Sequence, residues 1–437
     1  MPLFRGIPAL SPSAFRAFRV ALSVMLGVLL VSIWEGDIPL DVQREAPIAV
    51  IPGLRLLAAQ PAAMAWLQRS LLAALVLFGA GLWPRAAFAA VALGFNLWAC
   101  LLSLRGGIHF LGPLPLALVF LLPVPWQFGA RTGPASGSPG RMLVPPGYAP
   151  WVLSLAFSIA FAAAGYAKGA QWAMNGSVRY HFMVEADIAW VSFGPWIAAH
   201  TGLSVLLSWI VVVLEHAAIV APFLVPRWRA VAGVMAAGLL VGFTVMHNAL
   251  WPAWWTLLLG FAPWHLIARS GETPVPSWPR PALAVVAVAV LATQQLVATA
   301  RRIEAGPYLS AYDMYSTTWD SPDVFVRANG QPEFRVVATT PGGDVDVSGC
   351  VGADAASRAD LEASVSEEPG RASALARVQA RAVACARQVS GTRVRVAAEQ
   401  RFFDWQHGAT GWKFRDRTVG EWRVAESPEH SEGIPPA

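Results

Sequence analysis

Residues 163–176 read AAGYAKGAQWAMNG, in which an apolar run of small residues meets a lysine, a tryptophan and then a glycine. The run is the end of a longer apolar stretch, residues 151–168, that is long enough to cross a lipid bilayer as a helix. The lysine stands out because the chain contains only two, Lys168 and Lys413. This stretch therefore predicts a membrane helix that carries one unusual charge.

The composition indicates an integral membrane protein. Hydrophobic residues make up 55% of the chain, charged residues only 14%, and the mean hydropathy is +0.48. Residues 301–437 hold 16 basic and 19 acidic residues, so the remaining 300 residues contain only 24 charges. The net charge is +8 over residues 1–300 and −3 over residues 301–437. This uneven distribution of charge reflects membrane topology and does not indicate a nucleic-acid partner.

Apolar stretches predict an all-α polytopic membrane bundle of about nine transmembrane helices. The segment at 110–126 is the least regular, because Pro113, Pro115, Pro123 and Pro125 interrupt it. The expected spans are residues 17–34, 63–83, 86–104, 110–126, 151–168, 203–225, 230–249, 251–268 and 282–300. We expect a membrane domain at residues 1–303 and a small soluble α+β domain at residues 304–437.

Arginine positions predict the orientation of the spans. Most arginines of the membrane part fall before the first span or after an even-numbered one, which the positive-inside rule makes cytoplasmic. These are Arg5, Arg16, Arg19, Arg85, Arg131, Arg141, Arg227, Arg229, Arg269 and Arg280. With nine spans, the N-terminus is cytoplasmic and the tail is extracytoplasmic. The first helix resembles a signal-anchor and is expected to be retained.

The tail is expected to contain strands at 334–340 and 392–398 and a helix near 371–389. It also contains Cys350 and Cys385. An extracytoplasmic location allows a disulfide between them, and two free buried thiols are the alternative.

Lys168 admits two interpretations. A lysine at a helix end can extend to the membrane interface, and the predicted orientation of the helices places Lys168 at the outer boundary of the membrane. An ammonium in an apolar pocket instead loses its proton more readily, which provides an amine for acid–base chemistry. Arginine would serve at an interface equally well but cannot act as a base, so the rarity of lysine favours the second interpretation.

Other ionisable residues accompany Lys168. His109, His181, His200 and His247 map to the same outer side, and histidine is suited to proton transfer near neutral pH. Glu215 and His216 are expected near the middle of the membrane. They either belong to a functional site or form a hydrogen bond that holds packed helices together. Phosphate-binding, serine-triad and metal-binding motifs are not found in the sequence.

The stretch AGYAKGAQWAMNG, with the following SVRYHFM, resembles the central segment of the HTTM (horizontally transferred transmembrane) domain family. This family includes the membrane domain of vitamin K-dependent γ-carboxylases. Further similarities follow in the same order: Glu215 before Pro222, the pair His247-Asn248, and more weakly AYDMYSTTW at 311–319. The resemblance covers roughly residues 15–320.

The resemblance implies a carboxylase-like lyase activity with a reduced quinone (vitamin K- or menaquinone-like), oxygen and carbon dioxide, and with no metal. Lys168 would deprotonate the reduced quinone, a hydroquinone, whose oxygenation yields the base that removes a γ-proton from glutamate. Glu215 and His247 match positions near this site, and Trp172, Arg179, His181 and Asn248 are candidates for contacting the quinone or substrate. The substrate would be a secreted peptide or protein at the extracytoplasmic face.

SVRYHF also resembles the lipase maturation factors, which help secreted lipases to fold. The alternative function is therefore a non-enzymatic membrane assembly factor that binds a secreted partner. The spacing around Trp172 and Gly176 differs from that of the animal carboxylases, and the tail is much shorter than their lumenal region. Recognition of a propeptide is thus not implied.

Overall fold

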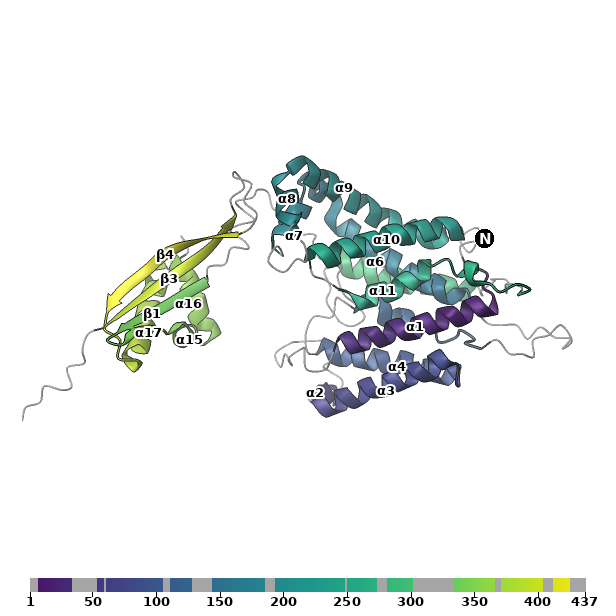
Figure 1. Cartoon of the computed structure of the whole chain (residues 1–437), viewed down its shortest axis with the longest axis horizontal. Helices are drawn as coiled ribbons and strands as arrows, with labels where there is room; N and C mark the ends of the chain where they lie inside the picture. The colour runs from purple at the N-terminus through teal and green to yellow at the C-terminus, as the bar shows by residue number, and fades with distance from the viewer. Residues whose placement is uncertain are drawn as a thin grey trace, which may run out of the picture. The chain divides into compact units, whose positions relative to one another are not determined.

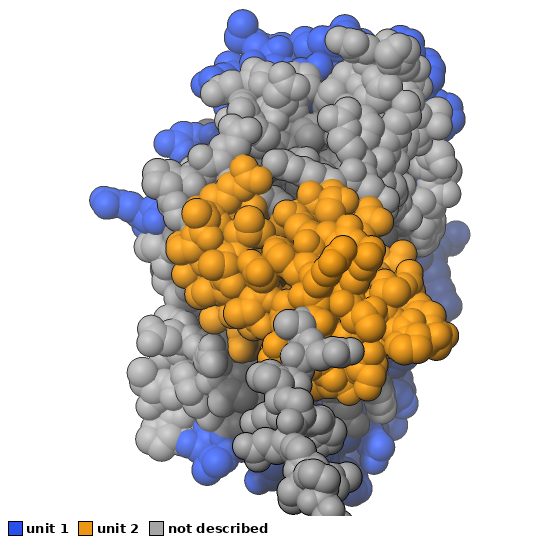
Figure 2. Space-filling model, turned by 90° about the vertical axis from the view of Figure 1, so that its left-hand side faces the viewer, with its two compact units in different colours: residues 1–318 blue, residues 319–437 orange. Residues whose placement is uncertain are grey.

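The computed structural model describes residues 7–33, 53–58, 60–104, 111–127, 144–184, 193–247, 250–272, 281–301, 333–365, 371–403 and 412–424. The chain divides into two compact units, Met1–Thr318 and Trp319–Ala437, shown in different colours in Figure 2. The sequence analysis placed this division after residue 303. The first unit is a bundle of helices, and the second combines an antiparallel sheet with helices (Figure 1).

Seven helices in the described residues are long and apolar enough to cross a membrane. They are α1 (Pro12–Ser32), α3 (Pro61–Ala80), α4 (Pro84–Ser103), α6 (Tyr148–Met174), α9 with η4 (Thr201–Phe223), α10 (Pro226–His247) and α12 with η7 and α13 (Pro281–Arg301). Shorter helices of this unit are α2 (Leu54–Ala58), α5 (Leu114–Phe120), α7 (Val178–Val184), α8 (Phe193–Ala199) and α11 (Pro252–Leu258).

Two of the nine expected spans are therefore not continuous long helices. In the segment at 110–126, helix α5 covers only Leu114–Phe120. Pro113 precedes it, Pro115 lies in its first turn, and Pro123 and Pro125 follow it, so backbone donors are missing along the segment. The segment at 251–268 is divided into α11 and two 3-10 turns, η5 (Leu259–Phe261) and η6 (Trp264–Ile267). Gly260 lies within η5, where a Cβ atom would be 2.3 Å from the Ser154 backbone nitrogen.

Both broken segments nevertheless run along the bundle to the same one of its two ends. We call these the Ser13 end, where α1 begins, and the His200 end, where α9 begins. In the segment at 110–126, the Pro115 carbonyl accepts from Asn96 in the middle of α4. The segment then reaches the Ser13 end at Trp126, which stacks on Phe15 with the ring centroids 5.4 Å apart. The other segment starts with Trp251 beside Phe243 of α10 and reaches the Ser13 end at Trp264, which packs against Phe18 of α1.

The bundle core is apolar and centred on α6, whose residues 148–163 are all buried. Aromatic rings fill the Ser13 end, where Phe78 and Phe88 join Trp126 in T-shaped and tilted contacts. In contrast, large apolar side chains are exposed along α1, α9, α10 and α12. Such surfaces are compatible with contact to a lipid bilayer.

The tail forms a four-stranded antiparallel sheet of order β2-β1-β3-β4. Its strands are β1 (Glu333–Thr340), β2 (Gly343–Asp346), β3 (Arg393–Phe403) and β4 (Trp412–Arg423), and its helices are α15 (Ser348–Val351), α16 (Ala355–Val365) and α17 (Arg371–Gln388). Alternate residues of β1 and β3, such as Val336 and Val394, pack with Val378 of α17 in one core. Strands at 334–340 and 392–398 and a helix near 371–389 were expected, whereas β2, β4, α15 and α16 were not.

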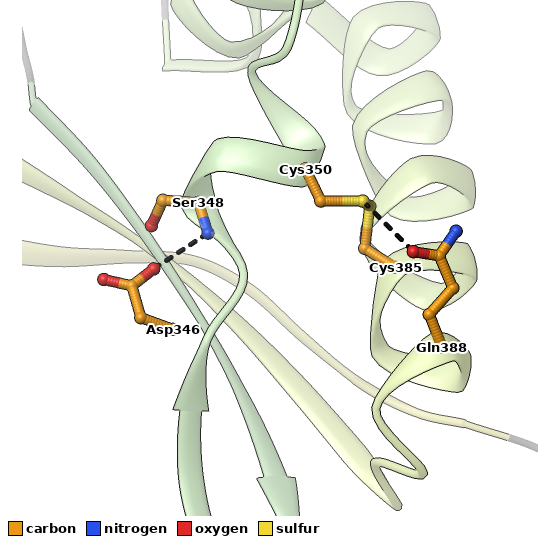
Figure 3. The surroundings of a disulfide bond; sticks show 5 residues. All are labelled: Asp346, Ser348, Cys350, Cys385 and Gln388. Atoms are coloured by element: carbon orange, nitrogen blue, oxygen red, sulfur yellow. Dashed lines mark hydrogen bonds between the residues drawn. A yellow bond between two sulfur atoms is a disulfide. The ribbon is translucent and has the colours of Figure 1, made fainter.

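Cys350 and Cys385 form a disulfide that joins α15 to α17, with their Cα atoms 6.1 Å apart (Figure 3). The two free thiols considered in the sequence analysis are thus not what the structure contains. Beside the bridge, the Ser348 backbone nitrogen donates to the Asp346 carboxylate over 2.8 Å, and this contact starts α15. The third cysteine, Cys100, is buried in α4 and is not part of a disulfide.

Candidate functional site

The candidate site is an ion pair between Lys168 and Glu215 inside the bundle. Lys168 Nζ donates to Glu215 Oε1 over 2.9 Å and to Oε2 over 3.0 Å. The side chains are only 3% and 2% exposed, so neither charge reaches solvent. Both Glu215 oxygens accept from the same ammonium, which is the geometry expected of a strong charge-assisted contact.

This contact corrects the positions expected from sequence. Lys168 was expected at the outer boundary and Glu215 near the middle, but a 2.9 Å contact requires the same depth. Glu215 lies fourteen residues after the start of α9 at Thr201, about 21 Å along the helix. The Lys168 ammonium is thus held within the bundle by the Glu215 carboxylate.

Backbone geometry at Gly169 positions Lys168. Gly169 has φ 66° and ψ −178°, so the regular turns of α6 stop at Lys168 and resume after it. No atom lies within 4 Å of the place where its Cβ would be, and the requirement for glycine is therefore conformational. The break directs the chain from Lys168 into the short helical turn that carries Trp172.

Close packing of α6 on α9 brings the two charges together. A Cβ atom on Gly165 would lie 2.9 Å from the Glu215 Cβ and 2.8 Å from His216 Nδ1, so only glycine permits this approach. His216 directs Nδ1 to the Val212 carbonyl, 2.8 Å away, and is more exposed than Glu215. The Glu215–His216 pair is therefore divided, with Glu215 facing α6.

The face of α9 that meets α6 and α7 is a stripe of small and polar residues. Ser204, Ser208, Val212 and Glu215 are the buried residues of α9. Ser208 Oγ accepts from the backbone nitrogen of Val178, at the start of α7, over 3.1 Å. The spacing of four, four and three residues marks one helix face, and it is the signal by which the sequence could have shown this role for the serines.

Trp172 and His181 line the His200 side of the pair. Lys168 Nζ lies 5.7 Å from the centre of the Trp172 ring, within the range of a cation–π contact. Trp172 also stacks on His181 at 6.0 Å, and both side chains are buried. The indole Nε1 of Trp172 has no hydrogen-bond partner among the described residues. A buried indole donor of this kind is available to an oxygen of a bound molecule.

The other candidate site residues are less closely associated with the Lys168–Glu215 pair. Arg179 contacts the Tyr180 ring at 4.7 Å and donates to the Tyr180 hydroxyl over 2.8 Å. His200 is exposed and stacks on Trp196 at the start of α9. His247 ends α10, but its side chain lies outside the described residues, as do Asn248, His109 and the segment 311–319.

A small apolar pocket lies elsewhere in the bundle, and neither Lys168 nor Glu215 lines it. It has a cavity volume of about 70 Å³ and lies between α6, α9 with η4, α10 and η5. Leu214 and Ala217, which flank the Glu215–His216 step, are among the residues that line it. Within the described residues, no group of three or more histidine, cysteine, aspartate or glutamate side chains has the arrangement of a metal site.

Comparisons with protein-family models, with curated proteins and with solved structures found no match. Within the part of the chain that the structure describes, the fold and site together define a helical protein with seven membrane-length apolar helices, a small disulfide-bonded α+β unit, and a buried lysine–glutamate pair.

Proposed function

We propose that this protein is a membrane-embedded enzyme, similar to the vitamin K-dependent γ-carboxylases, that modifies a peptide or protein at the extracytoplasmic face with a reduced quinone. The buried Lys168–Glu215 pair is the observation that supports this proposal. A buried ion pair is often no more stabilising than apolar residues of the same volume. Ionisable residues within membrane helices therefore usually mark a functional site.

The pair can act as a base through a balanced proton transfer. One proton passes from the Lys168 ammonium to the Glu215 carboxylate along the 2.9 Å hydrogen bond, which leaves an amine and a carboxylic acid. The amine then accepts a proton from an acidic hydroxyl group, and the pair ends with an ammonium and a neutral acid. Glu215 thus stores the first proton and allows Lys168 to take the second.

The buried indole beside the pair suits a polar head group. Trp172 Nε1 can donate a hydrogen bond to an oxygen of such a group. A reduced quinone, when bound, would supply the reducing equivalents, with oxygen and carbon dioxide as co-substrates. The order of motifs around Lys168 and Glu215 that resembles the HTTM family supports this choice.

We further propose nine membrane passes, with the N-terminus cytoplasmic and the tail outside. Both broken segments reach the Ser13 end of the bundle, and we count each as one pass, which keeps the number of passes odd. Arg16, Arg85 and Arg227 belong to the Ser13 end, which supports a cytoplasmic location for it. The Cys350–Cys385 disulfide suits an oxidising compartment. A reporter enzyme fused after residue 320 tests this, and cytoplasmic activity would contradict it.

The catalytic proposal is tested by following labelled carbon dioxide into peptides. The protein is purified with native lipid and supplied with reduced quinone, oxygen and candidate secreted peptides. We expect incorporation by the wild type and by Lys413→Arg, which changes the other lysine, and none by Lys168→Arg or Glu215→Gln. Full activity of Lys168→Arg, or incorporation without reduced quinone, would contradict the mechanism.

A non-enzymatic assembly factor is the second candidate, and the tail supports it. The helices cover one face of the sheet, and Arg335, Arg393 and Arg395 are exposed on the other. Such a face is available to a secreted partner. Co-purification of a stable protein partner without quinone, together with an active partner in the presence of Lys168→Arg, would favour this function over the enzyme.

A further inference from the structure

A groove runs along α1 at the Ser13 end of the bundle, away from Lys168. Its volume is about 690 Å³ and its walls are largely apolar. The residues that line it are Ser13, Arg16, Ala17, Val20, Ala21, Val24, Met25, Leu259, Ile267 and Arg269. Val20 and Val24 are 47% and 57% exposed, so the groove is open along its length.

The groove extends over about half the thickness of a bilayer. From Arg16 to Met25 the helix rises about 14 Å, and the hydrocarbon core of a bilayer is about 30 Å thick. The apolar wall therefore matches one leaflet, with the two arginines at the end where α1 begins. This is where the headgroup of a lipid in that leaflet would lie.

The arginine charges at this end are only partly compensated. The Arg16 side chain is 56% exposed, its Nε donates to the Pro12 carbonyl over 3.4 Å, and its Nη2 is 3.8 Å from Glu272 Oε1. Arg269 is also exposed. Glu272 is not among the residues that line the groove, and its Oε2 accepts from the hydroxyl and the backbone nitrogen of Ser13 at the edge of the groove.

We propose that this groove binds one anionic phospholipid, with an acyl chain along α1 and the phosphate held by Arg16 and Arg269. Guanidinium groups match phosphate oxygens with paired donors, and basic pockets between membrane helices commonly bind anionic headgroups. The apolar wall contacts the acyl chain of the lipid, and the two exposed arginines bind its negatively charged phosphate. This proposal does not depend on the chemistry at Lys168.

The test measures which lipid the full-length protein retains. The protein is reconstituted with equal amounts of phosphatidylglycerol and phosphatidylcholine, purified in mild detergent, and its bound lipid is counted by native mass spectrometry. We expect enrichment of phosphatidylglycerol, and a loss of about fivefold for each of Arg16→Gln and Arg269→Gln. Arg85→Gln, an exposed arginine at the same end that does not line the groove, is expected to retain the enrichment.

Two further results separate the site from general electrostatics. Val24→Trp fills the apolar wall without changing charge, so it is expected to reduce retention of phosphatidylglycerol while the protein remains monodisperse on size exclusion. Inorganic phosphate is expected not to displace the lipid. Equal loss in Arg85→Gln, unchanged retention in the Arg16→Gln/Arg269→Gln double variant, or displacement by phosphate would overturn the proposal.

Discussion

Gly165 of α6 faces Glu215 of α9 so closely that a Cβ atom on the glycine would lie 2.9 Å from the Glu215 Cβ. This approach brings the carboxylate within reach of Lys168, one helical turn further along α6. The ion pair therefore depends on a residue that carries no functional group. It also makes the packing of α6 on α9 part of the candidate site.

Gly165→Ala is expected to disrupt the site by packing alone. The added methyl group forces α9 away from α6, at a cost of about 1–3 kcal/mol, and lengthens the Lys168–Glu215 contact. Thermal unfolding in detergent measures the stability, and the carboxylation assay measures the function. Gly238→Ala in α10 is the control, because nothing lies within 4 Å of its Cβ position. Equal behaviour of the two variants would show that the close approach is unimportant.

The two charges are expected to be strongly coupled. Lys168→Met or Glu215→Leu alone leaves one uncompensated buried charge and is expected to destabilise the protein by about 3–5 kcal/mol. The double variant removes both charges and is expected to cost less than either single change. Unfolding of all four proteins completes a double-mutant cycle. Additive effects would mean that the two residues do not form a pair in the folded protein.

The disulfide is expected to stabilise the tail. Cys350 and Cys385 are 35 residues apart, and closing a loop of this length typically contributes about 2–4 kcal/mol. Reduction, or Cys350→Ser with Cys385→Ser, is therefore expected to speed proteolysis within residues 333–424 of the full-length protein. Cys100→Ala in α4 serves as the control and is expected to leave the tail resistant. An unchanged rate after reduction would contradict this role.

Tail stability is expected to fall in acid because of Asp360. Hydrogen bonds from Arg377, over 2.9 Å, and from Arg381 lower the pKa of Asp360 to about 2. The unfolded value is about 3.9, so the stabilisation is complete above that pH and is lost as the pH falls towards 2.

Hydrogen exchange of α16 and α17, corrected for the intrinsic pH dependence, measures this loss. Asp360→Asn is expected to remove the acid-dependent part, whereas Glu421→Gln, at an exposed position of β4, is expected to keep it. The same pH profile for the wild type and Asp360→Asn would show that other groups control acid unfolding of the tail.

Periodicity and composition were sufficient to predict the helical bundle and much of the tail. The apolar stretches correspond to long helices wherever no proline interrupts them, as in α1 and α10. The segments with Pro113 and Pro115, or with Gly260 and Pro263, cross the bundle as short pieces. Their apolar length was visible in the sequence, but their local breaks depended on contacts with α4 and α6.

The candidate site shows the same contrast between features that single residues reveal in the sequence and contacts between residues far apart in the chain. Lys168 and Glu215 were each identifiable, because a rare lysine and an intramembrane carboxylate are costly and stand out individually. Their depths were assigned separately, from two different helices, and the 2.9 Å contact shows that the two depths do not differ as expected. Residues 47 positions apart share a depth only when the packing of their helices is known.

The sequence by itself determined the membrane character, the charged tail and the residues with chemical potential, because these follow from composition and local spacing. The tertiary structure decided that Lys168 meets Glu215, that Gly165 lies against both Glu215 and His216, and that Arg16 and Arg269 share a groove. The physical reason is that helix formation is set by neighbours along the chain. Helix pairing depends instead on close packing between helices, and a small residue such as Gly165 permits a close approach without specifying the partner helix.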